Sequence, residues 1–140
     1  MWQTKIFAAF LLLGSTPSYA WRVSCMDDPV GNIRTCYVED KKIHIICPSE
    51  PHGCLISVGE GDVYPNSDIT VRIDENEPIS WKEGEIPLKV YDSVLEQMRS
   101  GNSLRFKWEI WPSGLENGEV SLNGFSTKLD EAIEKSKWEK

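Results

Sequence analysis

The segment LRFKWEIW, residues 104–111, decides the fold class because its side chains alternate between apolar and charged types up to its last residue. This two-residue period is that of a β-strand with one buried and one solvated face. The apolar side chains on the face expected to be buried are Leu104, Phe106, Trp108 and Ile110. Trp111 falls on the opposite face, just before the turn-forming residues 112–114, where it would either lie exposed or be covered by a C-terminal helix.

A change of period upstream of this strand predicts a helix. Within residues 88–99, apolar side chains recur three or four positions apart, at Tyr91, Val94, Leu95 and Met98. Gly101 follows where a helix is expected to stop. A second, shorter helix is predicted near the end of the chain, because Thr127 and Asp130 resemble a capping box. Its inward side chains would be Leu129, Ala132 and Ile133.

The remaining apolar segments are short and are separated by turn-forming residues. They predict strands at residues 21–26, 34–38, 42–47, 55–58, 69–74, 79–81 and 120–122. The chain contains no internal repeat and no linker long enough to divide it. We therefore expect residues 21–140 to form one mainly β domain, a disulfide-stabilised β-sandwich or barrel-like domain with one central helix and one short C-terminal helix.

Residues 1–20 have the pattern of a secretory signal peptide. Lys5 supplies the positive start, residues 6–13 the apolar core, and Ser18 and Ala20 the small side chains before a cleavage site. We predict cleavage after Ala20 and a periplasmic or secreted bacterial protein. No segment of the mature chain is apolar enough to predict a membrane span.

All four cysteines lie within the expected mature chain, where an oxidising compartment favours disulfides. We favour the local pairing of Cys25 with Cys36 and of Cys47 with Cys54, because each pair brackets turn-rich sequence. The alternative is a zinc site formed by His44, Cys47, His52 and Cys54, but their spacing fits no standard zinc finger. We therefore expect no metal and no cofactor.

Several short motifs resemble the invasion-associated locus B family of exported bacterial proteins. The motifs lie at residues 94–101, at residues 120–126 with Leu129 and Asp130, at residues 64–67 and 69–74, and at residues 21–25 with Cys36. The resemblance implies a protein of the bacterial envelope, and some members of the family are linked to host-cell invasion. The family offers no set of catalytic residues that could be assigned to positions of this chain. One departure is the second cysteine pair, which the family usually places after the strand that ends at Asp74 and which this chain carries earlier, at Cys47 and Cys54.

Charge and histidine content exclude several classes of function. The chain of 140 residues carries 15 Lys and Arg against 22 Asp and Glu, a formal net charge of −7, which argues against binding to nucleic acid. Its two histidines, His44 and His52, accompany no nucleophile motif. We therefore expect a protein that is not an enzyme.

Residues 60–85 hold eight acidic and two basic side chains, mostly in turns that could gather at one end of the domain. The candidate partner-binding residues are Glu60, Asp62, Asp68, Asp74, Glu75, Glu77 and Trp111. These residues predict an exported binding or envelope-associated protein whose partner is another protein, possibly a basic one. The alternative hypothesis is an inhibitor of a basic periplasmic or host hydrolase such as lysozyme.

Overall fold

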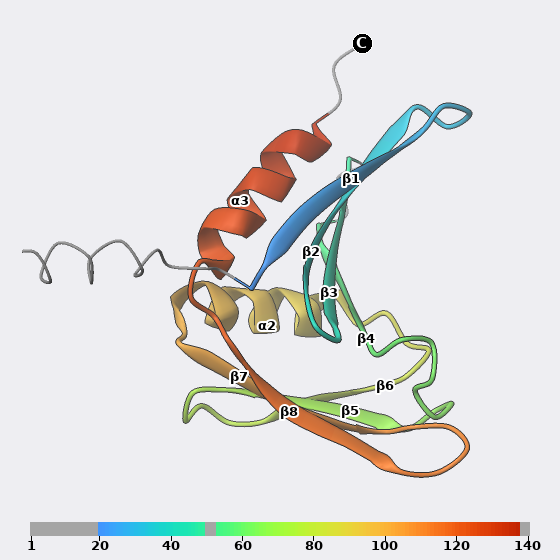
Figure 1. Ribbon diagram of the computed structural model, residues 1–140, viewed down its shortest axis with the longest axis vertical. Coiled ribbons are helices and arrows are strands. Elements are labelled where there is room, and N and C mark those ends of the chain that lie inside the picture. Colours follow the sequence, from blue (N-terminus) through green and yellow to red (C-terminus); the bar gives the residue numbers. More distant parts are fainter. Residues whose placement is uncertain (1–19, 50–52, 138–140) are drawn as a thin grey trace, which may run out of the picture.

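The computed structural model describes residues 20–49 and 53–137, which form two antiparallel sheets and two helices (Figure 1). The predicted signal peptide therefore lies outside the described residues, except for Ala20. The first sheet is a meander of four strands in chain order, β1 (Arg22–Asp28), β2 (Ile33–Asp40), β3 (Ile43–Pro48) and β4 (Leu55–Val58).

The second sheet has the strand order β6-β5-β7-β8. Its members are β5 (Asp68–Ile73), β6 (Ile79–Lys82), β7 (Ser103–Glu109) and β8 (Leu115–Ser121). The predicted strand at residues 104–111 supplies β7, which lies at the centre between β5 and β8. Helix α2 (Leu88–Ser100) connects β6 to β7 and contacts β4 of the first sheet as well as β5 and β6 of the second (Figure 1).

Helix α3 (Phe125–Ser136) packs on β1 and β2 and closes the upper part of the core (Figure 1). Its apolar stripe includes Phe125, Leu129 and Ala132, which are all buried. The predicted capping box is wrong, because the helix begins earlier and no side chain caps its first turn. Gly124 occupies the N-cap position with a φ of 81°, a left-handed conformation that favours glycine.

The inner faces of the two sheets and the stripes of both helices enclose one apolar core. The expected sandwich is therefore confirmed, and so are the central and the C-terminal helix. The barrel-like alternative is wrong, because each sheet ends in two strands that pair on one side only: β1 and β4 in the first, β6 and β8 in the second.

Both predicted disulfides are confirmed, and they lie side by side on the first sheet. Cys25 faces Cys36 across β1 and β2, and Cys36 faces Cys47 across β2 and β3. Cys47 is bonded to Cys54, just before β4. The alternative zinc site is wrong, because a zinc ligand must be a thiolate and neither Cys47 nor Cys54 holds one.

Asp40 lies buried at the end of β2, and this burial raises the pKa of its carboxyl above the ordinary 3.8, against the opposing charges of Lys41 and Arg22. The folded chain therefore binds this proton more tightly than the unfolded chain does. Asp40 thus adds stability as the pH falls through the raised value and removes it as the pH rises. Asp40→Asn should raise the melting temperature at neutral pH, with a smaller gain in acid, in thermal unfolding followed by circular dichroism. A lower melting temperature at neutral pH would contradict this account.

Candidate functional site

The candidate acidic residues fall at opposite ends of β5, and the expectation that they gather at one end is wrong. Glu60 and Asp62 precede β5, and Asp68 is its first residue. Asp74, Glu75 and Glu77 follow its last residue, in the turn to β6. A strand of 6 residues spans roughly 20 Å, which separates the two groups.

At the far end, the side chains of Asp74 and Glu75 are occupied by contacts within the fold. The carboxylate of Asp74 accepts hydrogen bonds from the backbone N–H groups of Asn102, at 3.1 Å, and Ser103, at 3.0 Å. Glu75 forms ion pairs with Arg72 and Arg105, which face each other across β5 and β7. Glu75 thereby offsets the repulsion between two adjacent guanidinium groups. The position of these acids has a structural explanation.

At the near end, acidic side chains outnumber the lysines that they surround. Asp68 pairs with Lys82 at 2.8 Å, and this contact raises the pKa of Lys82, with Glu85 adding to the shift. Contact with Glu116 raises the pKa of Lys42, and the charges of Glu60 and Asp62 raise it further. Each of the two lysines thus has one carboxylate partner and further acidic side chains nearby.

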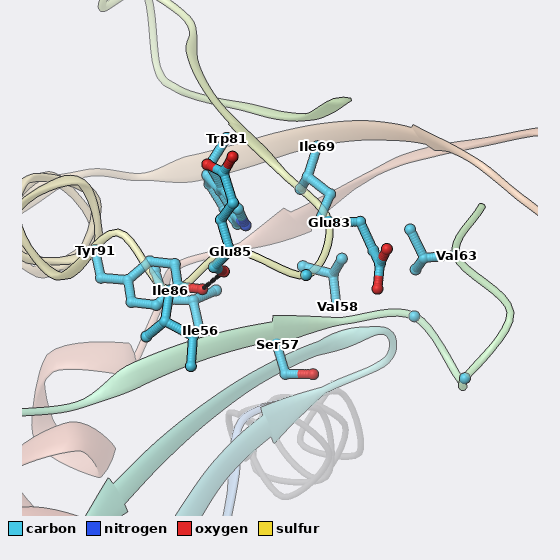
Figure 2. A pocket seen from close by; sticks show the side chains of 13 residues that line it. Ile56, Ser57, Val58, Val63, Ile69, Trp81, Glu83, Glu85, Ile86 and Tyr91 are labelled. Carbon is cyan, nitrogen blue, oxygen red and sulfur yellow. Dashed lines mark hydrogen bonds between the residues drawn. The ribbon is translucent and has the colours of Figure 1, made fainter. Parts of the chain in front are cut away.

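A cleft of about 440 Å³ opens at this end, between β4 of the first sheet and the β6–α2 connection of the second (Figure 2). Its floor consists of buried apolar and aromatic side chains from both sheets and from α2: Ile56, Val58, Ile69, Trp81 and Tyr91. The phenol of Tyr91 donates a hydrogen bond of 3.2 Å to the backbone oxygen of Glu85, which fixes the connection beside the floor.

The rim of the cleft carries carboxylates. Glu83 and Glu85 both line it, and Glu83 is held in place by accepting the backbone N–H of Asn66 at 2.9 Å (Figure 2). Ile86 also lines the cleft and is 65% exposed. Glu60 and Asp62 alternate in sequence with the lining residues 59, 61 and 63. The cleft thus combines an apolar floor with an acidic border.

Trp111 belongs to a neighbouring surface. It is 60% exposed and packs against Tyr64 with a ring-centroid distance of 5.3 Å, so the C-terminal helix does not cover it. Its backbone N–H donates to the oxygen of Asp62. Val63 lines the cleft, and its neighbours Asp62 and Tyr64 lie towards Trp111. Residues 62–64 therefore connect the Tyr64–Trp111 pair to the border of the cleft.

Of the two histidines, His44 lies within the described residues. His44 Nδ1 lies 2.8 Å from a carboxylate oxygen of Glu39, and its Nε2 lies 3.0 Å from the backbone oxygen of Gly59. Both ring nitrogens therefore have partners, one on β2 and one just after β4. His52 lies outside the described residues. Across residues 20–49 and 53–137, no three His, Cys, Asp or Glu side chains lie close enough together to hold a metal ion.

Comparisons with known proteins bear on the fold. No protein-family model matches the chain, and a search of curated proteins finds no significant match. Among solved structures, the crystal structure of invasion associated protein B from Bartonella henselae is similar, with a TM-score of 0.51 and 17% sequence identity. The similarity covers 89% of this chain and 99% of that one. The resemblance inferred from the sequence motifs is confirmed at the level of the fold.

At this identity, the likeness to invasion associated protein B concerns the arrangement of the chain and not its activity. Neither α2 nor α3 is long and apolar enough to cross a lipid bilayer.

The sequence placed Glu83 and Glu85 in the acidic stretch but did not single them out as candidates. It also missed the apolar floor, whose members come from β4, β5, β6 and α2. Tyr91 was expected on the apolar stripe of its helix and the other floor residues in short strands. Nothing in such patterns tells a core residue from one that borders a cleft. An available signal was Ile86, an isolated apolar side chain one residue after the acidic stretch.

Proposed function

We propose that the protein is an exported, non-enzymatic, envelope-associated binding protein that takes a segment of a basic partner protein into the cleft between β4 and the β6–α2 connection. The observation that carries this proposal is the combination of an apolar floor with a carboxylate rim in one accessible cleft. An apolar floor supplies affinity through burial, and the carboxylates select for positive charge and speed the encounter.

Further support comes from the charges around the cleft. Glu83 and Glu85 stand on the rim, and Lys82, the lysine next to them in the chain, already has Asp68 as its partner. Lys42 is likewise engaged, by Glu116 at 2.6 Å. The rim therefore has uncompensated negative charge that a lysine or arginine of a partner can neutralise.

Export is supported by two observations. One disulfide joins β1 to β2, and the other joins β3 to the residue just before β4, which suits an oxidising compartment such as the periplasm or the exterior. The similar fold of invasion associated protein B also suits an envelope protein. The predicted signal peptide at residues 1–20 completes this part of the proposal.

The test is capture of a partner from envelope extract by the mature chain, residues 21–140, in wild-type form and as two charge variants. Glu83→Gln/Glu85→Gln removes charge from the rim, and the amide oxygen at position 83 can still accept the hydrogen bond from Asn66. Glu75→Gln/Glu77→Gln removes the same charge at the far end of β5. We expect the rim variant to retain roughly a tenth of the wild-type amount, a loss of about 1.4 kcal/mol, and the far-end variant to retain nearly all.

The salt dependence of capture by the same three proteins provides a second test of binding through charge. Capture should weaken between about 0.1 M and about 1 M salt, because the Debye length falls from about 10 Å to about 3 Å. If both charge variants capture the partner as the wild type does, the cleft is not its binding site. A lysozyme activity assay with the three proteins tests the inhibitor alternative, which requires inhibition by the wild type that the rim variant loses.

A further inference from the structure

We propose that the partner segment binds as an added β-strand, pairing its backbone with the open edge of β4 and extending the first sheet from four strands to five. This inference rests on the proposed function and names the mode of binding and the chemistry of the partner segment. The segment would be extended, with apolar side chains alternating with lysine or arginine.

Strand β4 has one open edge. It is the last strand of its sheet and pairs with β3 alone, from Ile43 opposite Val58 to Ile46 opposite Leu55. Within the described residues, no backbone hydrogen bond joins the other edge of β4 to a further segment. Such an edge presents a row of N–H and C=O groups to which another extended chain can bond.

The open edge of β4 borders the cleft. Ile56, Ser57 and Val58 all line the cleft, although side chains alternate between the two faces of a strand. Ile56 and Val58 are buried on the inner face. Ser57 is exposed on the other face, opposite His44, and Figure 2 shows its side chain directed away from Val58. Ser57 therefore borders the cleft through its backbone, as an accessible strand edge requires.

The edge of β6 on the other side of the cleft is less suited to this role. Among the residues of β6, only Trp81 lines the cleft, through its side chain. The chain then turns away through residues 83–86, where the N–H of Glu85 bonds back to the oxygen of Lys82. Strand addition is therefore assigned to β4, and β6 contributes floor and rim.

The side chains of the added strand would point alternately into the cleft and to the surface. In a strand next to β4, every second side chain would point inward over the floor between Val58 and Trp81, where apolar groups are favoured. The intervening side chains would lie at the surface. Long flexible stems let lysine or arginine reach from there to Glu83 and Glu85. Because β4 has only 4 residues, a segment of similar length is enough.

The probe is an acetylated, amidated heptapeptide of alternating lysine and valine, and its control alternates glutamate and valine. We expect the lysine peptide to bind the wild-type chain, to bind Glu83→Gln/Glu85→Gln about tenfold more weakly, and to bind Glu75→Gln/Glu77→Gln as it binds the wild type. The glutamate peptide should not bind. Calorimetric titration measures all of these affinities.

Backbone pairing is tested by two methylated forms of the lysine peptide, one with N-methyl groups on the valine amides and one with them on the lysine amides. Successive N–H groups of a strand point to opposite edges, so each form blocks one edge only. We expect one form to lose about tenfold or more in affinity and the other to bind as the parent does. The amide of Gly59 bonds to Lys42 on the β3 side, so the amides of Ile56 and Val58 point to the open edge. Hydrogen exchange should slow at these two amides on binding, and not at those of β6.

The outcomes separate the two proposals. Binding that is weakened by Glu83→Gln/Glu85→Gln but affected equally by both methylated forms, or by neither, overturns strand addition and leaves the proposed function standing. Failure of the peptide to bind, while the envelope partner still depends on Glu83 and Glu85, also overturns strand addition. Loss of any dependence on these carboxylates in both experiments overturns the proposed function as well.

Discussion

Replacing Trp21 by alanine should lower the free energy of unfolding by about 3–5 kcal/mol, the usual cost of truncating a buried tryptophan. Trp21 is 1% exposed and stands just before β1. Its ring packs edge-on against Phe125 of α3, with 4.9 Å between ring centroids. Its Nε1–H donates a hydrogen bond of 2.8 Å to the backbone oxygen of Ser121 in β8. One side chain thus joins both sheets and the C-terminal helix, and its loss leaves a cavity at their junction.

The matched control is Trp111→Ala, which removes the same number of atoms from a side chain that is 60% exposed. Its cost should stay within about 1 kcal/mol. Urea unfolding followed by tryptophan fluorescence and circular dichroism gives both values. Equal losses for the two variants, or a loss below about 1 kcal/mol for Trp21→Ala, would contradict the assignment of Trp21 to the core.

Removing the first disulfide by Cys25→Ala/Cys36→Ala should cost about 2.5–3 kcal/mol. The bond closes a loop with a sequence separation of 11, and opening it increases the conformational freedom of the unfolded chain. The second disulfide closes a shorter loop, with a separation of 7, so Cys47→Ala/Cys54→Ala should cost slightly less, about 2.5 kcal/mol. The free energies come from urea unfolding under non-reducing conditions.

Wild-type protein in excess dithiothreitol supplies the control for the disulfide variants. Reduction opens both loops without changing a side chain, and its effect should approach the sum of the two double substitutions. If reduction leaves the urea midpoint unchanged, the bonds contribute nothing to stability. If only one double substitution reproduces the effect of reduction, only that bond contributes.

The elements predicted best from the sequence are those determined by residues that lie close together in the chain. Strand β7 follows from an alternation that ends only at Trp111, and α2 from a stripe that begins at Tyr91, because each buries one face. The disulfide pairing followed from short loops. In each case the residues that decide the structure are close together in the sequence.

The remaining features depend on contacts between distant segments. Strand β8 begins at Leu115, several residues before the predicted strand, and includes Gly118 opposite Phe106. A side chain on Gly118 would meet that ring, since a Cβ atom would lie 2.8 Å from its Cζ. A glycine required by such packing looks, in the sequence alone, like a turn. Likewise, the split of the acidic residues follows from the length of β5, and the cleft from the way two sheet edges face each other.

The carboxylates beside β4 have one more consequence, for the behaviour of the pure protein at high concentration. An open strand edge can pair with the same edge of a second molecule, which is a common start of edge-to-edge polymerisation. Two copies approaching in this way would bring Glu83 and Glu85 of each towards those of the other, and the like charges repel. The acidic rim thereby keeps identical molecules apart, and this protection fades as acid neutralises the carboxylates or as salt screens them.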